Sequence, residues 1–416
     1  MKKQILFIRT VVLLQTAYCL LPTISFAQFI AAGDLHSLAI CIDSTARAWG
    51  YNYYGELGTG TNTDSNIPAE VSSVTGITAT GAGWDHSVTL QNDGTVWAWG
   101  LNFDGQLGNG TNTDSNIPVQ VSSLTSIKAI AIGYQHSLAL KNDGSVWAWG
   151  FNFFGQLGNG ANIDSYVPVQ LTSITDITAI AGGGDHSLAL KNDSTVWAWG
   201  FNNDGELGNG TNTDSNVPVQ VVSLTGIIAI AAGHTHSLAL KNDGTVWAWG
   251  WNIYGQLGDG SYTDSNVPVE VNSLSNITAI AGGEFHSLAL KNDGIVWTWG
   301  KNVYGQLGNG TNIDSNLPVE VSSLIGITAL AGGTMHSLAL KNDGTVWAWG
   351  RNTEGQLGNG NNTNSNVPRA GHRVVSGCNF MQRCFHSICR YINTTSLLGI
   401  ELRDGSSTIN LLLELG

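Results

Sequence analysis

The sequence predicts an all-β fold, a seven-bladed β-propeller built from seven 50-residue repeats with four-stranded blades. A His-Ser pair, a Trp-Gly pair and a Gly-(Gln/Glu)-Leu-Gly turn recur seven times in the same order at a spacing of 50 residues. A fixed period of this kind marks repeated structural units. Each unit is too small to bury its own apolar face, so the copies must pack on one another.

Each repeat contains four short segments whose residue patterns are typical of β-strands. In the fifth copy, residues 236–241 alternate in polarity, Asn-Asp-Gly at 242–244 forms a turn, and a second strand follows over 245–249. A Pro-led strand is expected over 268–271, and an apolar run occupies 277–282. This last run is rich in Ala and Gly, as expected where backbones crowd towards a central axis. Four strands per copy favour a propeller over a β-solenoid.

The repeat motif reads G-x-x-H-S-L-A-L, then G-x-V-W-x-W-G-x-N-x-x-G-Q-L-G, over about residues 29 to 376. It resembles the regulator-of-chromosome-condensation repeat. The resemblance implies a seven-bladed propeller, in agreement with the strand pattern. It also implies two further functions: guanine-nucleotide exchange on a small GTPase, as in eukaryotic members, and inhibition of an enzyme, as in the similar secreted propeller inhibitor of β-lactamase.

The first 27 residues have the pattern of a secretory signal peptide: three basic residues, an apolar stretch over 11–21 and small residues up to Ala27. A retained membrane anchor is the alternative, but the apolar run is short and interrupted. We therefore expect three parts: a signal peptide at 1–27, a propeller at 28–376 and a divergent tail at 377–416. The mature chain is expected to be secreted or extracytoplasmic and not inserted in a membrane. Export disfavours nucleotide exchange, because an exported protein meets no cytosolic GTPase.

The charge of the chain argues against nucleic acid as a partner. The formal net charge is -13, and loss of the signal peptide with its three basic residues makes it more negative still. An acidic surface without a Lys/Arg cluster repels phosphate backbones and anionic lipid headgroups. We expect a monomer that binds a protein or glycan.

The repeated His, Ser and Trp residues are expected to be structural. Adjacent His and Ser point to opposite faces of a strand and cannot form a nucleophile-base pair. We expect each His to bond a neighbouring turn, each Ser to bond backbone, and the indoles to donate to backbone carbonyls. Outside the repeated positions, no set of residues has the pattern of a catalytic acid, base or nucleophile or of a metal site. We therefore expect no enzymatic activity and no cofactor.

One polar loop, at 110–118, superficially resembles a calcium site because it places oxygens at alternate positions. We favour a local role, in which Asp114 and its neighbours bond backbone and shape the turn.

Recognition of a partner is expected where the copies differ. Two sets of positions vary: the two residues before each His, and the residues just after each Trp-Gly pair. Large aromatic side chains beside acidic ones are typical of a recognition surface. The alternative is that some rings pack beneath their own glycine-rich loops. The candidate partner-binding residues are Asp34, Trp84, Asp85, Tyr134, Gln135, Asp185, His234, Glu284, Phe285 and Met335 from the first set, and Tyr54, Phe103, Phe153, Phe154, Trp251 and Tyr254 from the second.

The tail after Pro368 departs from the repeat, although His386-Ser387 stays on the 50-residue register. A decayed eighth copy, a stretch translated out of its ancestral frame, and a sorting or closure segment remain open. The predicted mature chain has four cysteines, Cys41, Cys378, Cys384 and Cys389, which allow three pairings. A bridge from Cys41 to the tail would tie the ends of the ring together.

Overall fold

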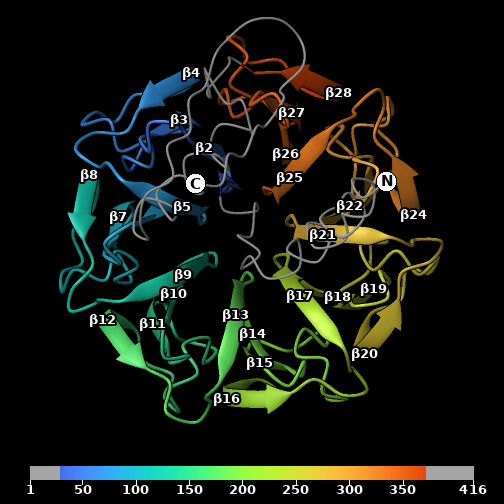
Figure 1. The fold of residues 1–416 in the computed structure, drawn as a ribbon, viewed down its shortest axis with the longest axis horizontal. Coiled ribbons are helices and arrows are strands. Elements are labelled where there is room, and N and C mark those ends of the chain that lie inside the picture. The colour runs from blue at the N-terminus through green and yellow to red at the C-terminus, as the bar shows by residue number, and fades with distance from the viewer. Residues whose placement is uncertain (1–28, 372–416) are drawn as a thin grey trace, which may run out of the picture. The chain divides into compact units, whose positions relative to one another are not determined.

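The computed structural model describes residues 29–371, which form seven antiparallel four-stranded sheets arranged in a ring (Figure 1). Within each sheet the strands lie side by side in the order in which they follow in the chain. The predicted seven-bladed propeller is confirmed. No helix among these residues is long and apolar enough to cross a membrane. The predicted signal peptide, the tail and its cysteines lie outside the described residues.

Every blade contributes one strand to each of four concentric positions (Figure 1). The innermost strands are β1 (Ile30–Ala32), β5 (Ile77–Ala82), β9 (Ile127–Ile132), β13 (Ile177–Gly182), β17 (Ile227–Ala232), β21 (Ile277–Gly282) and β25 (Ile327–Gly332). The second strands are β2 (His36–Ile40), β6 (His86–Gln91), β10 (His136–Lys141), β14 (His186–Lys191), β18 (His236–Lys241), β22 (His286–Lys291) and β26 (His336–Lys341). The third strands are β3 (Ala46–Gly50), β7 (Val96–Gly100), β11 (Val146–Gly150), β15 (Val196–Gly200), β19 (Val246–Gly250), β23 (Val296–Gly300) and β27 (Val346–Gly350). The outermost strands are β4 (Ser65–Glu70), β8 (Ser115–Gln120), β12 (Ser165–Gln170), β16 (Ser215–Gln220), β20 (Ser265–Glu270), β24 (Ser315–Glu320) and β28 (Ser365–Ala370).

The strands form for the reasons that the sequence indicates, with one correction. In the fifth blade Gly244 takes a φ of 82° in the turn between β18 and β19, a conformation that glycine adopts without steric cost. The Pro-led strand was predicted wrongly: β20 begins at Ser265, and Pro268 lies inside it. Proline is tolerated there because β20 is an edge strand, paired on one side only.

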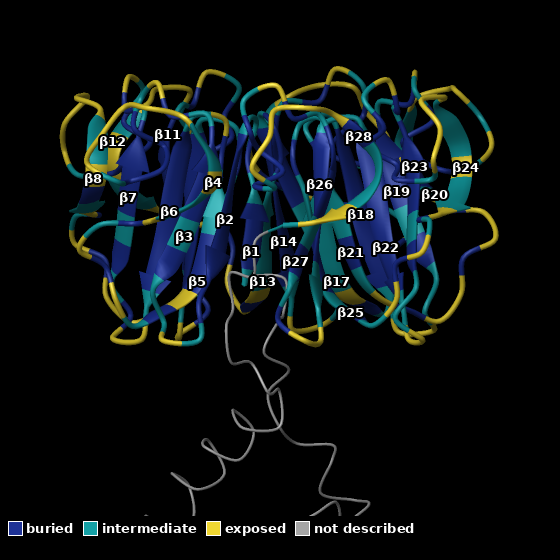
Figure 2. Cartoon of the chain, turned by 90° about the horizontal axis from the view of Figure 1, so that it is seen from above, coloured by how far each residue is buried: buried dark blue, intermediate teal, exposed yellow. Residues whose placement is uncertain are grey.

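The core lies between the blades, where each blade buries its second tryptophan against its predecessor. Trp249 of the fifth blade packs on Leu188, Val196 and Leu207 of the fourth, and its indole is fully buried. The first tryptophan, such as Trp247, is only partly buried in the same interface. Figure 2 shows the result: buried strands across the thickness of the ring, with the exposed residues mostly in loops at its two ends.

A hydrogen-bonded chain of His, Ser and carbonyl joins each blade to the next. His186 Nε2 lies 2.9 Å from Ser237 Oγ of the following blade, and Ser237 Oγ donates to the Glu206 carbonyl at 2.9 Å. Trp249 Nε1 donates to the same carbonyl at 2.8 Å. The predictions for Ser and for the second tryptophan are confirmed. The prediction for His was wrong: it bonds a serine across the blade interface and not a turn.

The ring closes through the same contacts that join its other blades. Between the seventh and first blades, His336 Nε2 lies 2.9 Å from Ser37 Oγ, and both Ser37 Oγ and Trp49 Nε1 donate to the Gln356 carbonyl at 2.9 Å. Among the described residues no strand is exchanged between the first and last blades, because β1 to β4 all belong to the first sheet and β25 to β28 to the last. Cys41 is buried just after β2.

Candidate functional site

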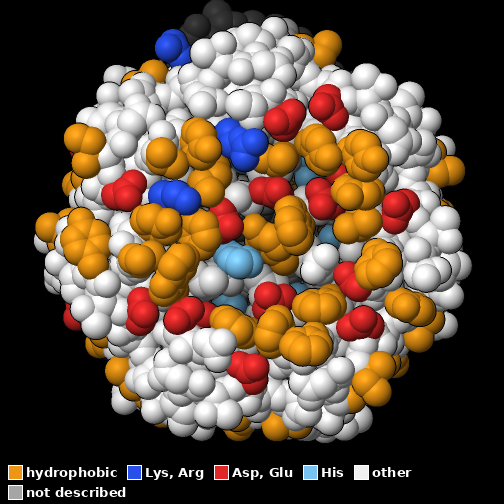
Figure 3. Space-filling view, turned by 180° about the vertical axis from the view of Figure 1, so that it is seen from behind, with side chains coloured by type: hydrophobic (Ala, Val, Ile, Leu, Met, Phe, Trp, Pro, Cys, Tyr) orange, Lys and Arg blue, Asp and Glu red, His pale blue; other side chains and the backbone are white. Residues whose placement is uncertain are grey.

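Both variable sets of residues lie at one end of the ring. The first set forms the loops between the innermost and second strands, and the second set forms the loops between the third and outermost strands. In an up-and-down sheet these two connections leave at the same end, so the sets combine into one surface, which we call the variable face. Figure 3 shows apolar and acidic side chains gathered around its centre.

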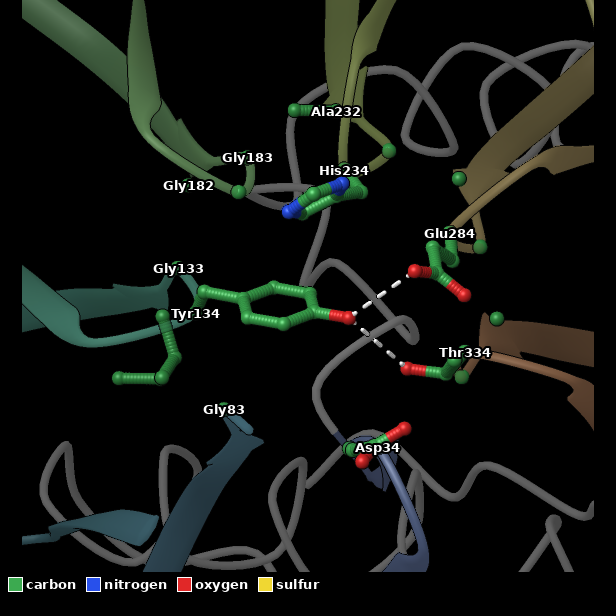
Figure 4. Close-up of a pocket in the computed structure, with 18 of the residues that line it drawn as sticks. Asp34, Gly83, Gly133, Tyr134, Gly182, Gly183, Ala232, His234, Glu284 and Thr334 are labelled. Atoms are coloured by element: carbon green, nitrogen blue, oxygen red, sulfur yellow. Dashed lines mark hydrogen bonds between the residues drawn. The ribbon is translucent and has the colours of Figure 1, made fainter. Parts of the chain in front are cut away.

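The middle of the variable face is a small cavity at the mouth of the central channel, which we call the central well. Glycine and alanine residues of the innermost strands line its wall and leave a volume of about 140 Å³. The polar side chains that point into it come from the first variable position of five blades: Asp34, Tyr134, His234, Glu284 and Thr334 (Figure 4).

Tyr134 reaches across the well from the third blade to the sixth and seventh. Its hydroxyl donates to Glu284 Oε1 at 3.3 Å and lies 3.5 Å from Thr334 Oγ1 (Figure 4). Its ring lies between two other rings, with centroids 4.2 Å from His234 and 5.0 Å from Trp84. Trp84 Nε1 in turn donates to Asp34 Oδ2 at 2.7 Å. The sequence-predicted residues Asp34, Trp84, Tyr134, His234 and Glu284 therefore form one connected cluster.

Burial changes the titration of the groups in this cluster. Burial and the negative charge of Asp34 raise the pKa of Glu284 to about 7, although Lys301 and Tyr134 act in the opposite direction. Burial also raises the pKa of Asp34, against hydrogen bonds from Thr334 and Trp84. Burial lowers the pKa of His234 to about 4, so its imidazole is neutral at pH 7. The well therefore has acceptor oxygens, a Glu284 carboxyl that is only partly ionised at pH 7, and no positive charge from its own histidine.

Residues at the second variable position lie between the well and the outer loops. Asp185 Oδ1 accepts a hydrogen bond from Gln156 Nε2 at 3.1 Å, and Met335 Sδ lies 3.5 Å from Gln306 Nε2. Burial and the charge of Asp34 raise the pKa of Asp85 to about 6. Gln135 is half-buried. None of these four predicted site residues lines the well, and Asp185 and Met335 contact glutamines of the preceding blade instead.

Phe285, also at the second variable position, links the two variable sets. Its ring centroid lies 5.1 Å from that of Trp251 and 5.5 Å from that of Tyr254, which both belong to the preceding blade. Lys301 Nζ lies 4.7 Å above the rings of both Tyr254 and Phe285. The predicted residues Trp251, Tyr254 and Phe285 therefore form a second aromatic cluster, with a lysine held over it by cation–π contact.

The remaining aromatic residues divide into exposed and supporting rings. Phe103 and Phe153 are 72% and 66% exposed. Tyr54 and Phe154 are half-buried and support exposed neighbours edge-on, with Phe154 5.0 Å from Phe153. The alternative that some rings pack beneath their own loops therefore describes Tyr54 and Phe154, while Phe103 and Phe153 present free apolar surface.

Three features of the variable face were missed by sequence reasoning. Thr334 and Lys301 belong to the variable positions but are not distinctive residue types, and their roles depend on Tyr134 and Tyr254, which come from other blades. Gly184 stands where other blades carry a side chain, and a Cβ there would collide with the ring of His234. Gly184 could have been noticed in the sequence, since it interrupts a series of larger residues at the first variable position.

Models of known protein families match most of the propeller. The model described as the RCC1-like domain matches residues 167–389, which is more than half of the chain. Models described as the regulator of chromosome condensation (RCC1) repeat match residues 48–90, 93–140 and 143–190, and a second repeat model matches 28–56, 77–106 and 127–156. The chain belongs to the RCC1 repeat family.

Solved structures agree with this assignment. Human WBSCR16 is 25% identical with a TM-score of 0.70, over 77% of this chain and 92% of that one. Yeast RCC1 (Prp20), solved bound to Kap60, is 22% identical with a TM-score of 0.70, over 83% and 85%. Prp20p from Saccharomyces cerevisiae, described with its binding properties to Gsp1p and histones, is 23% identical with a TM-score of 0.70, over 83% and 87%. The two yeast structures share the fold with this chain. No curated protein matches the sequence.

Proposed function

We propose that this chain is an exported, non-catalytic binding module that recognises a protein partner through the variable face. One observation carries the proposal. The polar residues that every blade repeats, such as His186 and Ser237, are buried and bonded between blades, whereas the residues that differ gather on one accessible face. Only the differing residues can give this member of the family a partner of its own.

The composition of the face supports a protein as the partner. Seven of its variable positions are acidic and two are basic, which favours a partner with positive charge. Exposed rings such as Phe103 and Phe153 offer flat apolar contact area at low cost in side-chain entropy. The binding of Kap60, Gsp1p and histones recorded for the yeast relative is also binding of proteins.

The N-terminal sequence supports export. Basic residues, an apolar stretch over 11–21 and small residues up to Ala27 form the three parts of a signal peptide. Under this proposal the partner lies outside the cytoplasm, on the producing cell or in its surroundings.

Site-specific photo-crosslinking tests the proposal. The photoreactive residue p-benzoylphenylalanine replaces Phe103 or Phe153 on the variable face, and Asn192 in an exposed turn at the other end of the ring as the control. We expect ultraviolet light to give a discrete, protease-sensitive adduct from positions 103 and 153 only.

N-terminal sequencing of the same material tests export, and the sequence is expected to begin at Gln28.

Three outcomes would contradict parts of this proposal. Adducts that form equally from position 192 would place the partner elsewhere on the ring. An adduct that resists protease but yields to glycosidases would identify a glycan as the partner. An intact Met1 on protein recovered from the cytosol would refute export.

A further inference from the structure

We propose that the central well receives one basic side chain, Lys or Arg, from the protein that docks on the variable face. This inference rests on the proposed function and narrows it to a single residue of the partner.

The oxygen atoms around the well suit a cationic group with several N–H donors. Glu284, Thr334 and Asp34 come from the three consecutive blades six, seven and one, and the Tyr134 hydroxyl meets them from the opposite side (Figure 4). The second carboxylate oxygen of Glu284, Oε2, is buried and has no hydrogen-bond partner among the described residues. An ammonium has three donors and a guanidinium five, enough to reach several of these oxygens at once.

The chain compensates these carboxylates only in part: the charge of Lys301 lowers the pKa of Glu284, and that of Arg351 lowers the pKa of Asp34. Within residues 29–371, neither Glu284 nor Asp34 forms an ion pair. The two basic residues at the rim of the well are held elsewhere: Lys301 lies over the rings of Tyr254 and Phe285, and Arg351 pairs with Glu354 at 3.8 Å. A buried carboxylate without a counter-charge is costly, so an incoming cation gains attraction without displacing an internal partner.

The size and walls of the well select a side chain. A volume of about 140 Å³ is below the 300 Å³ or more that is usual for drug-sized ligands, and it is close to the roughly 150 Å³ that accommodates a benzene-sized group. The adjacent, tilted rings of Tyr134 and His234 in the wall, with Trp84 beside Tyr134, give the alkyl stem an apolar surface, and the Tyr134 ring offers cation–π contact. A long side chain with a charged end meets all of these conditions.

Selection from a random heptapeptide display library tests the inference with the full chain as bait. We expect enriched peptides to share one Lys or Arg. The variant D34N/E284Q keeps the shape of the two side chains and one acceptor oxygen on each, replaces the other oxygen by an amide donor and removes both charges. It is expected to bind the best synthetic peptide at least about ten-fold more weakly. The matched control E270Q/E320Q removes two exposed charges from the outermost strands β20 and β24 and should bind as the parent does.

A second peptide separates charge from packing. Norleucine replaces the shared Lys, which keeps the alkyl stem and removes the cation. If the shared residue is Arg, a Lys peptide is made first and is then compared with its norleucine counterpart. We expect this peptide to bind the parent and D34N/E284Q equally and weakly. Thr334→Val removes an uncharged hydroxyl acceptor. It should weaken binding of the Lys peptide and leave binding of the norleucine peptide unchanged. Thermal melts of all variants check that each is folded.

The results that overturn the inference are distinct from those that overturn the proposed function. Enrichment of peptides without a shared basic residue, or equal affinity of parent and D34N/E284Q for the Lys peptide, would refute a cation-binding well. If crosslinks from Phe103 and Phe153 persist in that case, the variable face still binds a partner and only the role of the well is wrong.

Discussion

Glu56 and Glu206 occupy a position that holds glutamine in the other five copies, and both are fully buried. In the third blade Gln156 donates from Nε2 to Asp185 Oδ1 at 3.1 Å. Glu56 has no such amide, its Oε1 has no partner among the described residues, and the neighbouring residue is Asp85. Burial raises the pKa of Glu56 to about 8, so the side chain holds a proton at pH 7.

We expect Glu56→Gln to stabilise the protein, and to do so more at pH 8 than at pH 5. The unfolded carboxyl loses its proton above a pKa of 4.5, whereas the folded one keeps it up to about 8, so the parent loses stability as the pH rises between these values. Glutamine does not titrate and can donate to Asp85 as Gln156 does to Asp185. The gain should be on the order of 1–3 kcal/mol at pH 8 by denaturant unfolding.

Glu320→Gln is the matched control, because Glu320 is exposed on an outermost strand. It should leave the free energy of unfolding nearly unchanged at either pH. A gain for Glu56→Gln that is the same at pH 5 and pH 8 would mean that Glu56 is not protonated in the folded protein.

At the scale of strands and blades, the interface between the last blade and the first has the same hydrogen bonds as the interior interfaces. Ser37 accepts from His336 and donates to the Gln356 carbonyl, as Ser187 does with His136 and the Gln156 carbonyl. The apolar cluster at closure is also built on a buried tryptophan, Trp49. Within residues 29–371, the ring is therefore closed by the same kind of contact that joins its other blades, without strand exchange.

We expect Ser37→Ala and Ser187→Ala to lower the free energy of unfolding by the same amount, about 1–3 kcal/mol each. Either change leaves a buried histidine N–H unsatisfied and removes one of two donors from a buried carbonyl. Chemical denaturation of both variants measures the comparison. A Ser37→Ala variant as stable as the parent would show that the ring is open between its first and last blades.

How far the strands and the site can be predicted depends on whether a contact repeats. His186, Ser237 and Trp249 serve the same purpose in every blade, so periodicity alone identifies them as structural. The contacts of Tyr134 with Glu284 and Thr334 occur once and join residues 150 and 200 positions apart. Such contacts depend on the reach of individual side chains across the channel. The pattern therefore locates the variable face but not the connections within the well.

For the whole molecule, buried histidines and buried carboxylic acids have opposite effects on acid stability. Burial lowers the pKa of all seven repeated histidines to about 3. The unfolded histidine binds a proton below pH 6.5, so each one costs stability as the pH falls. Burial also raises the pKa of Glu56 and Glu206 to about 8 and of Glu284 to about 7, and these groups gain stability as the pH falls towards 4.5.

We expect the melting temperature to fall moderately between pH 7 and pH 5, because seven histidines outnumber the three carboxyl groups, and to fall more steeply between pH 5 and pH 4. Between pH 7 and pH 5 the protonation of the three carboxyl groups offsets part of the cost of the histidines. Below pH 5 the carboxyl groups add little further stability, because they become protonated in the unfolded chain as well. Each of the seven histidines continues to lower the free energy of unfolding by about 1.4 kcal/mol per pH unit. Calorimetry over this range measures the profile.

The double variant E56Q/E206Q provides the check on this explanation. It lacks two of the compensating carboxyl groups, so its melting temperature should fall further between pH 7 and pH 5 than that of the parent. A parent protein that becomes steadily more stable down to pH 4 would contradict the histidine effect.

Each blade is one uninterrupted length of chain, and its contacts with either neighbour are the same all around the ring. A crossover in the gene between two copies therefore deletes, adds or exchanges a complete blade and leaves every strand paired. The coding sequence can diversify its recognition loops one copy at a time, because those loops share no residues with the histidine–serine contacts that hold the blades together. New binding specificities are thus accessible by duplication and shuffling of a single genetic unit, with no redesign of the interior.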